Sequence, residues 1–192
     1  CKGDPTPLWE IRARRVVHDE VERQIYFDRA QFRLAGVPVL YIPRLRMPDP
    51  TLKRATGFLM PTIRTTSDLG TGIKLPYFIV LGKSADLTLT PYVTTKNSET
   101  LDLRYRQAFA TGLIEATGSV SRDDLIPGKT RGYLRVKGAF TLPERFLLTF
   151  DGQTVTDPAY MLDYGIGNED RLDSRVEIKR TQSNEHIASR WI

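Results

Sequence analysis

Apolar and polar residues alternate with a period of two along most of this chain. Between residues 100 and 110, apolar side chains fill alternate positions and charged ones lie between them. Successive side chains of a β-strand point to opposite faces, so the pattern predicts a strand with one apolar and one charged face. The alternation recurs at 132–142 and 144–153, and more weakly at 86–95 and 174–182. The periodicity therefore predicts an all-β protein.

The length of these strands favours a transmembrane barrel. Strands that cross an outer membrane have about 9 to 11 residues, whereas strands of a soluble sandwich have about 5 to 6. Turn signals separate the runs, among them the polar stretch 121–131 and the longer stretch 156–172. We therefore predict an antiparallel meander of about eight strands. The predicted lipid-facing side chains are Leu103, Leu134, Val136, Phe140, Leu148 and Phe150, and the predicted lumenal ones are Arg104, Arg106, Arg135 and Lys137.

The first 50 residues differ from the rest. The stretches 9–17, 23–34 and 37–42 are strand-like but dense in Arg and Asp, and a proline cluster at Pro43, Pro48 and Pro50 follows them. Proline cannot donate a ladder hydrogen bond, so we expect the sheet to stop there. The sequence predicts a boundary within residues 43–56, between a small water-soluble β part (1–50) and the meander (51–192).

Composition excludes several other classes of protein. The 192 residues carry a net charge of +5, but the two signs are interspersed, which argues against nucleic-acid binding. The longest apolar run, Tyr77 to Leu81, is far shorter than the roughly 20 residues of a membrane-spanning helix. One Cys and two His exclude a Cys/His zinc site. We predict no metal, no cofactor and no enzymatic activity. His18 lies beside Asp19, which suggests an acid–base pair, but no nucleophile is near it in the sequence and it is not a convincing catalyst.

Motifs at the junction carry a resemblance to a known family. The runs 36–43 (GVPVLYIP), 48–50 (PDP) and 53–61 (KRATGFLMP) resemble the signature of the LptD family of lipopolysaccharide-assembly outer-membrane proteins, also called OstA or Imp. The resemblance continues, in the order of that family, at 68–70, 75–78, 87–91, 157–160 and 163–165. It covers the chain nearly end to end and looks most like the versions found in alphaproteobacteria.

The resemblance implies a fold and a transport function. It implies that residues 1–50 are the last strands of a periplasmic β-jellyroll and that 51–192 are the first strands of an outer-membrane barrel. In that family, lipopolysaccharide passes its acyl chains through the jellyroll and leaves sideways where the first and last barrel strands meet. The partners implied are lipopolysaccharide, the plug lipoprotein LptE and the periplasmic bridge protein LptA. The chain begins with Cys and has no leader, so we interpret it as a piece of a longer protein.

Two prolines are the main candidate functional residues. Pro61 and Pro76 each interrupt a strand-like run, and a missing N–H weakens strand pairing locally. They match the family's proline positions in its first two barrel strands, which implies a lateral gate for lipid. The alternative is that both prolines only end strands. Pro91, in a third strand, is interpreted as a rim or bulge residue.

The remaining candidates are in the first part of the chain. Trp9, Ile11, Phe32, Leu34 and Val39 are candidates to line the acyl-chain path, or they form an ordinary sandwich core. The basic residues Arg44, Arg46, Lys53 and Arg54 are candidates to contact lipid A phosphates, or they form a solvated linker. Cys1 resembles a half-cystine of the family and would form a disulfide in the full-length protein, or it is a free thiol.

Two rival functions remain open on the sequence. An ordinary outer-membrane porin would show the same alternation, although the strands before residue 50 and the proline pair argue against it. A soluble β-sandwich binding module would need clustered carboxylates and exposed aromatic side chains in a groove. The Asp and Glu residues here are instead spread over every strand.

Overall fold

The structure is a computed structural model that describes residues 9–34, 36–49, 51–52, 54–166, 173–182 and 185–191. The predicted all-β class is confirmed, because antiparallel strands make up nearly all of its regular structure. The chain divides into two compact units, Cys1–Phe58 and Leu59–Ile192. In the described residues, no helix has the length and apolar character needed to cross a membrane.

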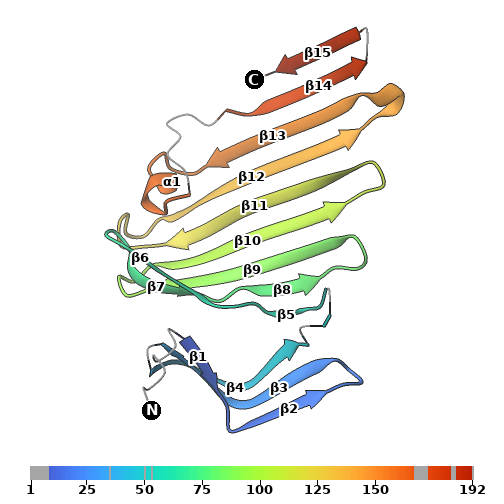
Figure 1. The fold of residues 1–192 in the computed structure, drawn as a ribbon. Helices are drawn as coiled ribbons and strands as arrows, with labels where there is room; N and C mark the ends of the chain where they lie inside the picture. Colours follow the sequence, from blue (N-terminus) through green and yellow to red (C-terminus); the bar gives the residue numbers. More distant parts are fainter. Residues whose placement is uncertain are drawn as a thin grey trace, which may run out of the picture. The chain divides into compact units, whose positions relative to one another are not determined.

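The first unit is built around one long central strand, β3 (Gln24–Leu34). The short strands β1 (Trp9–Arg12) and β2 (Arg15–Asp19) follow one another along one edge of β3, and β4 (Val37–Pro48) pairs along the other (Figure 1). The two-residue strand β5 (Gly57–Phe58) ends the unit. The predicted run 9–17 is therefore two strands, which both pair with β3.

The first sheet ends within the expected proline cluster, because β4 continues past Pro43 and ends at Pro48. Pro43 lies opposite Arg29, the position at which the β3–β4 pairing is interrupted. Arg29 has a φ of 53°, so the backbone of β3 is already distorted there. No ladder hydrogen bond is required from Pro43 at such an irregularity, and the strand tolerates the proline.

From β8 to β15 the second unit is an antiparallel meander in which neighbours in sequence are neighbours in the sheet (Figure 1). Its strands are β6 (Thr62–Thr66), β7 (Gly70–Lys74), β8 (Tyr77–Val80), β9 (Ala85–Thr94), β10 (Glu99–Ala108), β11 (Gly112–Arg122), β12 (Thr130–Thr141), β13 (Leu147–Val155), β14 (Arg175–Gln182) and β15 (Glu185–Trp191). A 3₁₀ turn, η1 (Pro143–Arg145), joins β12 to β13. Strands β7 and β8 follow one another along the same edge of β9.

The strand register confirms the predicted separation of the two faces. Directly paired residues share a face of a sheet. Leu134 pairs with Gly118, which in turn pairs with Leu103, and Arg135 pairs with Thr117 and through it with Arg104. The same register places Val136, Phe140, Leu148 and Phe150 on the apolar face, and Arg106 and Lys137 on the polar face.

The core of the second unit lies on the polar face of the sheet. The connection from β13 to β14, interpreted from the sequence as a turn, contains the one-turn helix α1 (Tyr160–Asp163), which packs against β12. Tyr160 and Tyr164 are buried there with Leu69 and Tyr92. The segment around α1 therefore folds back onto the sheet instead of extending away from it.

Candidate functional site

Pro76 separates β7 from β8 without changing the strand register. The pairs Lys74–Tyr92 and Tyr77–Leu89 belong to one continuous register along β9. At the gap, the carbonyl oxygen of Pro76 accepts a hydrogen bond from the Leu59 amide at 2.8 Å. The reciprocal bond would need an N–H on Pro76, which proline lacks. One rung of the ladder is therefore missing beside the first strands of the unit.

Pro61 lies in a β-bulge immediately before β6. On one side of it is the Leu59 to Pro76 hydrogen bond, and on the other is the Thr62–Lys74 pair. Between these two points the segment that leads into β6 contributes Met60 and Pro61, whereas the segment opposite contributes only Leu75. Two residues opposite one define a bulge, which leaves one residue unpaired and increases the local twist.

Pro91 lies inside β9 and faces the same interruption. The Leu75 amide donates a hydrogen bond to the Pro91 carbonyl oxygen at 3.1 Å. In an antiparallel pair the two residues normally exchange two such bonds, but Pro91 has no N–H to return. Pro61, Pro76 and Pro91 therefore lie together across three neighbouring segments, and hydrogen bonding around Leu75 is depleted on both sides.

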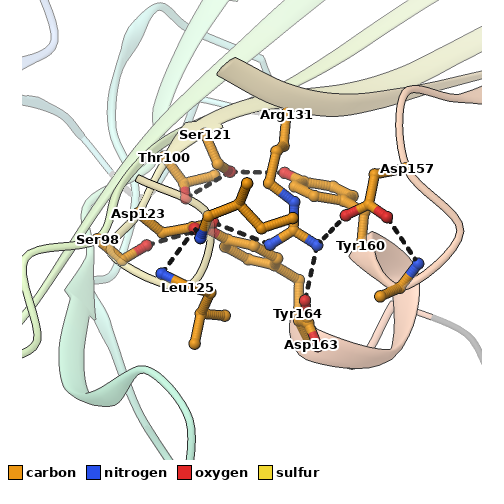
Figure 2. A network of polar contacts seen from close by, with 12 residues as sticks. Ser98, Thr100, Ser121, Asp123, Leu125, Arg131, Asp157, Tyr160, Asp163 and Tyr164 are labelled. Carbon is orange, nitrogen blue, oxygen red and sulfur yellow. Dashed lines mark hydrogen bonds and ion pairs between the residues drawn. The ribbon is translucent and has the colours of Figure 1, made fainter. Parts of the chain in front are cut away.

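A buried polar network holds the α1 segment on the polar face (Figure 2). The guanidinium of Arg131, only 2% exposed, pairs with Asp123 at 3.2 Å and with Asp163 at 2.7 Å. It also pairs with Asp157 and lies over the ring of Tyr160, 5.4 Å from its centroid. Arg131 comes from β12, Asp123 from the β11–β12 loop, and Asp157 and Asp163 from the connection that contains α1, so this one side chain joins three segments.

The two tyrosine hydroxyls complete this network (Figure 2). The Tyr160 hydroxyl lies 2.6 Å from the hydroxyls of both Ser119 and Ser121. The Tyr164 hydroxyl donates to Asp123 at 2.7 Å and lies 3.0 Å from the Ser98 hydroxyl. Because buried polar groups without partners are costly, these hydroxyl contacts favour the position in which the segment around α1 packs on the sheet.

Arg131 and Asp123 were missed as site residues by sequence reasoning. The only signal was the spacing Asp157, Tyr160, Asp163 and Tyr164, since residues three and four apart share a face of a helical turn. All four side chains contact the network in the structure. The family-like residues at 157–160 and 163–165 thus have a physical role as an anchor.

The predicted acyl-path residues form cross-strand pairs in the first unit. Ile11 pairs with Phe32, which is 5% exposed, and the backbones of Trp9 and Leu34 pair beside them. The side chains of Trp9 and Leu34 lie outside the described part of the chain. Val39 lies at a register shift and is 47% exposed, and Leu40 is the β4 partner of Phe32.

The predicted basic residues occupy different surroundings. Arg44 lines an open hollow of about 540 Å³ together with Arg14, Arg15 and Arg29, with Asp28 as its acidic residue. Arg46 instead donates to the Gln24 side chain at 3.0 Å and lies over the Tyr26 ring. Arg54 is partly buried. Lys53 and Cys1 lie outside the described residues, so the phosphate contact and the disulfide remain predictions for them.

His18 contacts an acid that the sequence did not indicate. Its Nε2 atom pairs with Asp49, 31 residues away, and not with the adjacent Asp19. The Thr51 amide also donates to Asp49 at 2.7 Å, and the hydrogen bonds from Thr51 are the main cause that lowers the pKa of Asp49 to about 2. This contact joins the end of β4 to β2. In the described chain, no three His, Cys, Asp or Glu side chains cluster as metal ligands would.

Comparison with known proteins assigns the chain to a family. No protein-family model matches it. It is 33% identical over 161 residues to LPS-assembly protein LptD of Bordetella pertussis, covering 83% of this chain and 20% of the relative. It is 26% identical to LptD of Idiomarina loihiensis (92% and 23% covered) and 27% identical to LptD of Xanthomonas euvesicatoria (98% and 24% covered). The chain thus spans about a fifth to a quarter of the length of these curated relatives. It belongs to the LptD family of LPS-assembly proteins.

Proposed function

We propose that the chain forms the end of a periplasmic β-jellyroll and the opening strands of an outer-membrane barrel that inserts lipopolysaccharide into the outer leaflet. The names of its relatives, LPS-assembly proteins, support the substrate class. The apolar face of the meander, with Leu134, Val136 and Phe150, then contacts lipid, and the charged face lines the lumen. LptE and LptA are the partners that the family resemblance implies for the complete protein.

The observation that carries this proposal is the cluster of prolines beside the first strands of the second unit. Pro76 and Pro91 each omit one rung, and Pro61 lies in a bulge between them and β6. A porin wall gains nothing from such a weak place, because it has to stay closed to lipid. A barrel that releases a lipid sideways needs strands that separate at low cost, and we assign Pro61 and Pro76 to that lateral gate.

In the first unit we assign the acyl-chain path to the apolar face around Phe32. Ile11 and Leu40 flank Phe32 on the neighbouring strands, so a continuous apolar strip crosses the sheet. The hollow with Arg14, Arg15, Arg29 and Arg44 supplies cations for lipid A phosphates, which arginine binds with two hydrogen bonds each. Arg44 is thus the member of the predicted basic set that we place closest to the headgroup.

Photo-crosslinking in living cells tests the proposal. In the full-length protein, Phe32 is replaced by p-benzoylphenylalanine, and the same replacement is made at Val21, which is 95% exposed in a turn. Ultraviolet light should yield a lipopolysaccharide adduct from position 32 and none from position 21. Equal adducts at both positions, or none at position 32 while surface lipopolysaccharide is normal, would remove the acyl path from this face.

A further inference from the structure

A cavity of about 210 Å³ opens on the polar face of the second unit. Its lining includes Arg64 of β6, Lys74 of β7, Tyr92 of β9, Arg104 of β10, Tyr133 of β12, and Tyr164 next to α1. This volume has room for about seven water molecules at ~30 Å³ each, or for one sugar ring. It is separate from the Arg131 network, although Tyr164 belongs to both.

Tyr92, which lines this cavity, has a buried hydroxyl group without a hydrogen-bond partner among the described residues. Tyr92 is 1% exposed, and its hydroxyl makes no hydrogen bond with any described residue. A buried hydroxyl without a partner is unusual in folded proteins and unfavourable, so such a group calls for a ligand or an ordered water. The ammonium of Lys74 lies 5.0 Å from the centroid of the same ring. Tyr92 therefore offers an unused hydroxyl beside a cation.

The charges around the cavity are unbalanced. Lys74 pairs with Asp102 at 2.6 Å and Arg104 with Glu115 at 2.6 Å. Arg64 has no acidic partner among the residues that the structure describes. A Cβ atom added at Gly165 would lie 2.3 Å from an Arg64 nitrogen, so the guanidinium packs directly on the backbone of the α1 segment. The guanidinium of Arg64 is thus fixed by packing, and its N–H donors are available to a ligand.

We propose that this cavity binds a sugar that carries a phosphate group. The phosphate oxygens would accept hydrogen bonds from Arg64 and from the Tyr92 hydroxyl, with Lys74 adding positive charge. The phenol rings of Tyr133 and Tyr164 supply flat surfaces for the sugar ring. This inference rests on the proposed function, in which the polar face lines the lumen, and it names the part of the cargo that the lumen recognises. Arg64 and Lys74 lie on the two strands next to the prolines, so the cargo would be held beside the gate.

Calorimetry on the full-length protein in nonionic detergent tests the site. The probes are glucose 1-phosphate, glucose and inorganic phosphate. We expect glucose 1-phosphate to bind more tightly than inorganic phosphate and glucose not to bind. Arg64→Gln should weaken glucose 1-phosphate binding at least tenfold, Arg64→Lys less, and Tyr92→Phe several-fold. Arg122→Gln removes the same charge from an exposed position and should leave the affinity unchanged.

Two results would overturn the proposal. Equal affinity for inorganic phosphate and glucose 1-phosphate would reduce the site to an anion site without sugar recognition. Unchanged affinity in both Arg64→Gln and Tyr92→Phe would move the ligand elsewhere. The photo-crosslink at position 32 is independent of Arg64. Loss of the crosslink alone would overturn the acyl-chain path and leave the sugar site supported. Loss of sugar binding alone would overturn the sugar site and leave the acyl-chain path supported.

Discussion

The two halves of the second unit's sheet are built differently. Strands β11 and β12 have 11 and 12 residues and pair with each other without a break. Strands β6, β7 and β8 have only 5, 5 and 4 residues, because prolines interrupt the runs that contain them. The long strand β12 alternates apolar and polar residues, whereas β8 is a continuous apolar run. The short strands also lie beside prolines, so their pairing has fewer hydrogen-bond donors.

Side-chain contacts widen the difference. Arg135 makes two hydrogen bonds with Asp151 across β12 and β13, and Arg106 makes two with Asp86 across β9 and β10. Partly exposed pairs of this kind contribute little each, but Arg131 is buried and joins three acids near the start of β12. The comparison supports the proposed lateral gate, which requires strands that separate at lower cost beside strands that stay paired.

The largest expected effect is on the region of long strands, from Arg131→Met. Removing this cation leaves Asp123, Asp157 and Asp163 without their partner, which should reduce the free energy of unfolding by about 3 to 5 kcal/mol. Urea unfolding of the full-length protein in detergent measures the loss. Arg122→Met at an exposed position is the matched control and should change stability by less than about 0.5 kcal/mol. Equal effects of the two variants would show that the network does not stabilise this region.

The second effect concerns the apolar face of the same region. Val136 and Lys137 are adjacent in β12 and lie on opposite faces. Val136→Arg should cost about 2 to 4 kcal/mol if its side chain lies at mid-membrane, whereas Lys137→Gln keeps a polar residue in the lumen. We expect only Val136→Arg to lower the amount of assembled barrel, measured by heat-modifiable migration on gels. Equal tolerance of both changes would contradict the assignment of faces.

The sequence predicts the strongly alternating strands and fails where tertiary contacts decide. Strands β10, β12 and β13 follow from large apolar and charged residues at alternate positions. β11 has a weaker pattern, because Ala116 and Gly118 occupy its apolar-face positions. The short helix α1 was not predicted, since its position depends on Arg131, which the sequence places at the end of a polar stretch interpreted as a turn.

The candidate site was predictable only in part, for the same reason. The prolines are visible in the sequence because their missing N–H does not depend on context. The strand register decides which residue opposite a proline lacks a hydrogen bond. The place of Pro91 opposite Leu75 therefore became apparent only in the structure. The partner of His18 was likewise not predictable from the sequence, because Asp49 lies on a distant segment that the β3–β4 hairpin brings close.

The third prediction concerns the weak region. Pro76→Ala can return a hydrogen bond to Leu59, and Pro91→Ala can return one to Leu75, for about 0.5 to 1.5 kcal/mol each. In the full-length protein this double change should leave barrel abundance near normal, lower surface lipopolysaccharide and raise sensitivity to large hydrophobic antibiotics. Adding Pro61→Ala should lower delivery further, but by less than either of the other changes, because a residue in a bulge has no directly paired partner for a restored N–H. Pro127→Ala, in the exposed β11–β12 turn, is the control. Normal delivery in the double variant would return the prolines to the role of strand-end residues.

The smallest expected effect is a pH-dependent transition in the first unit, at Asp49. The pKa of Asp49 is lowered from 3.8 to about 2, mainly by hydrogen bonds from Thr51 and also by His18. A lowered carboxyl pKa stabilises the folded state above about pH 4, and this contribution is lost as the pH falls from 4 towards 2. An NMR titration of the Thr51 amide in the full-length protein should therefore show a midpoint near pH 2. Asp49→Asn should abolish that transition, while Glu20→Gln in the exposed turn should leave it unchanged. A midpoint near 3.8 would show that the Asp49 carboxylate is not held by these hydrogen bonds.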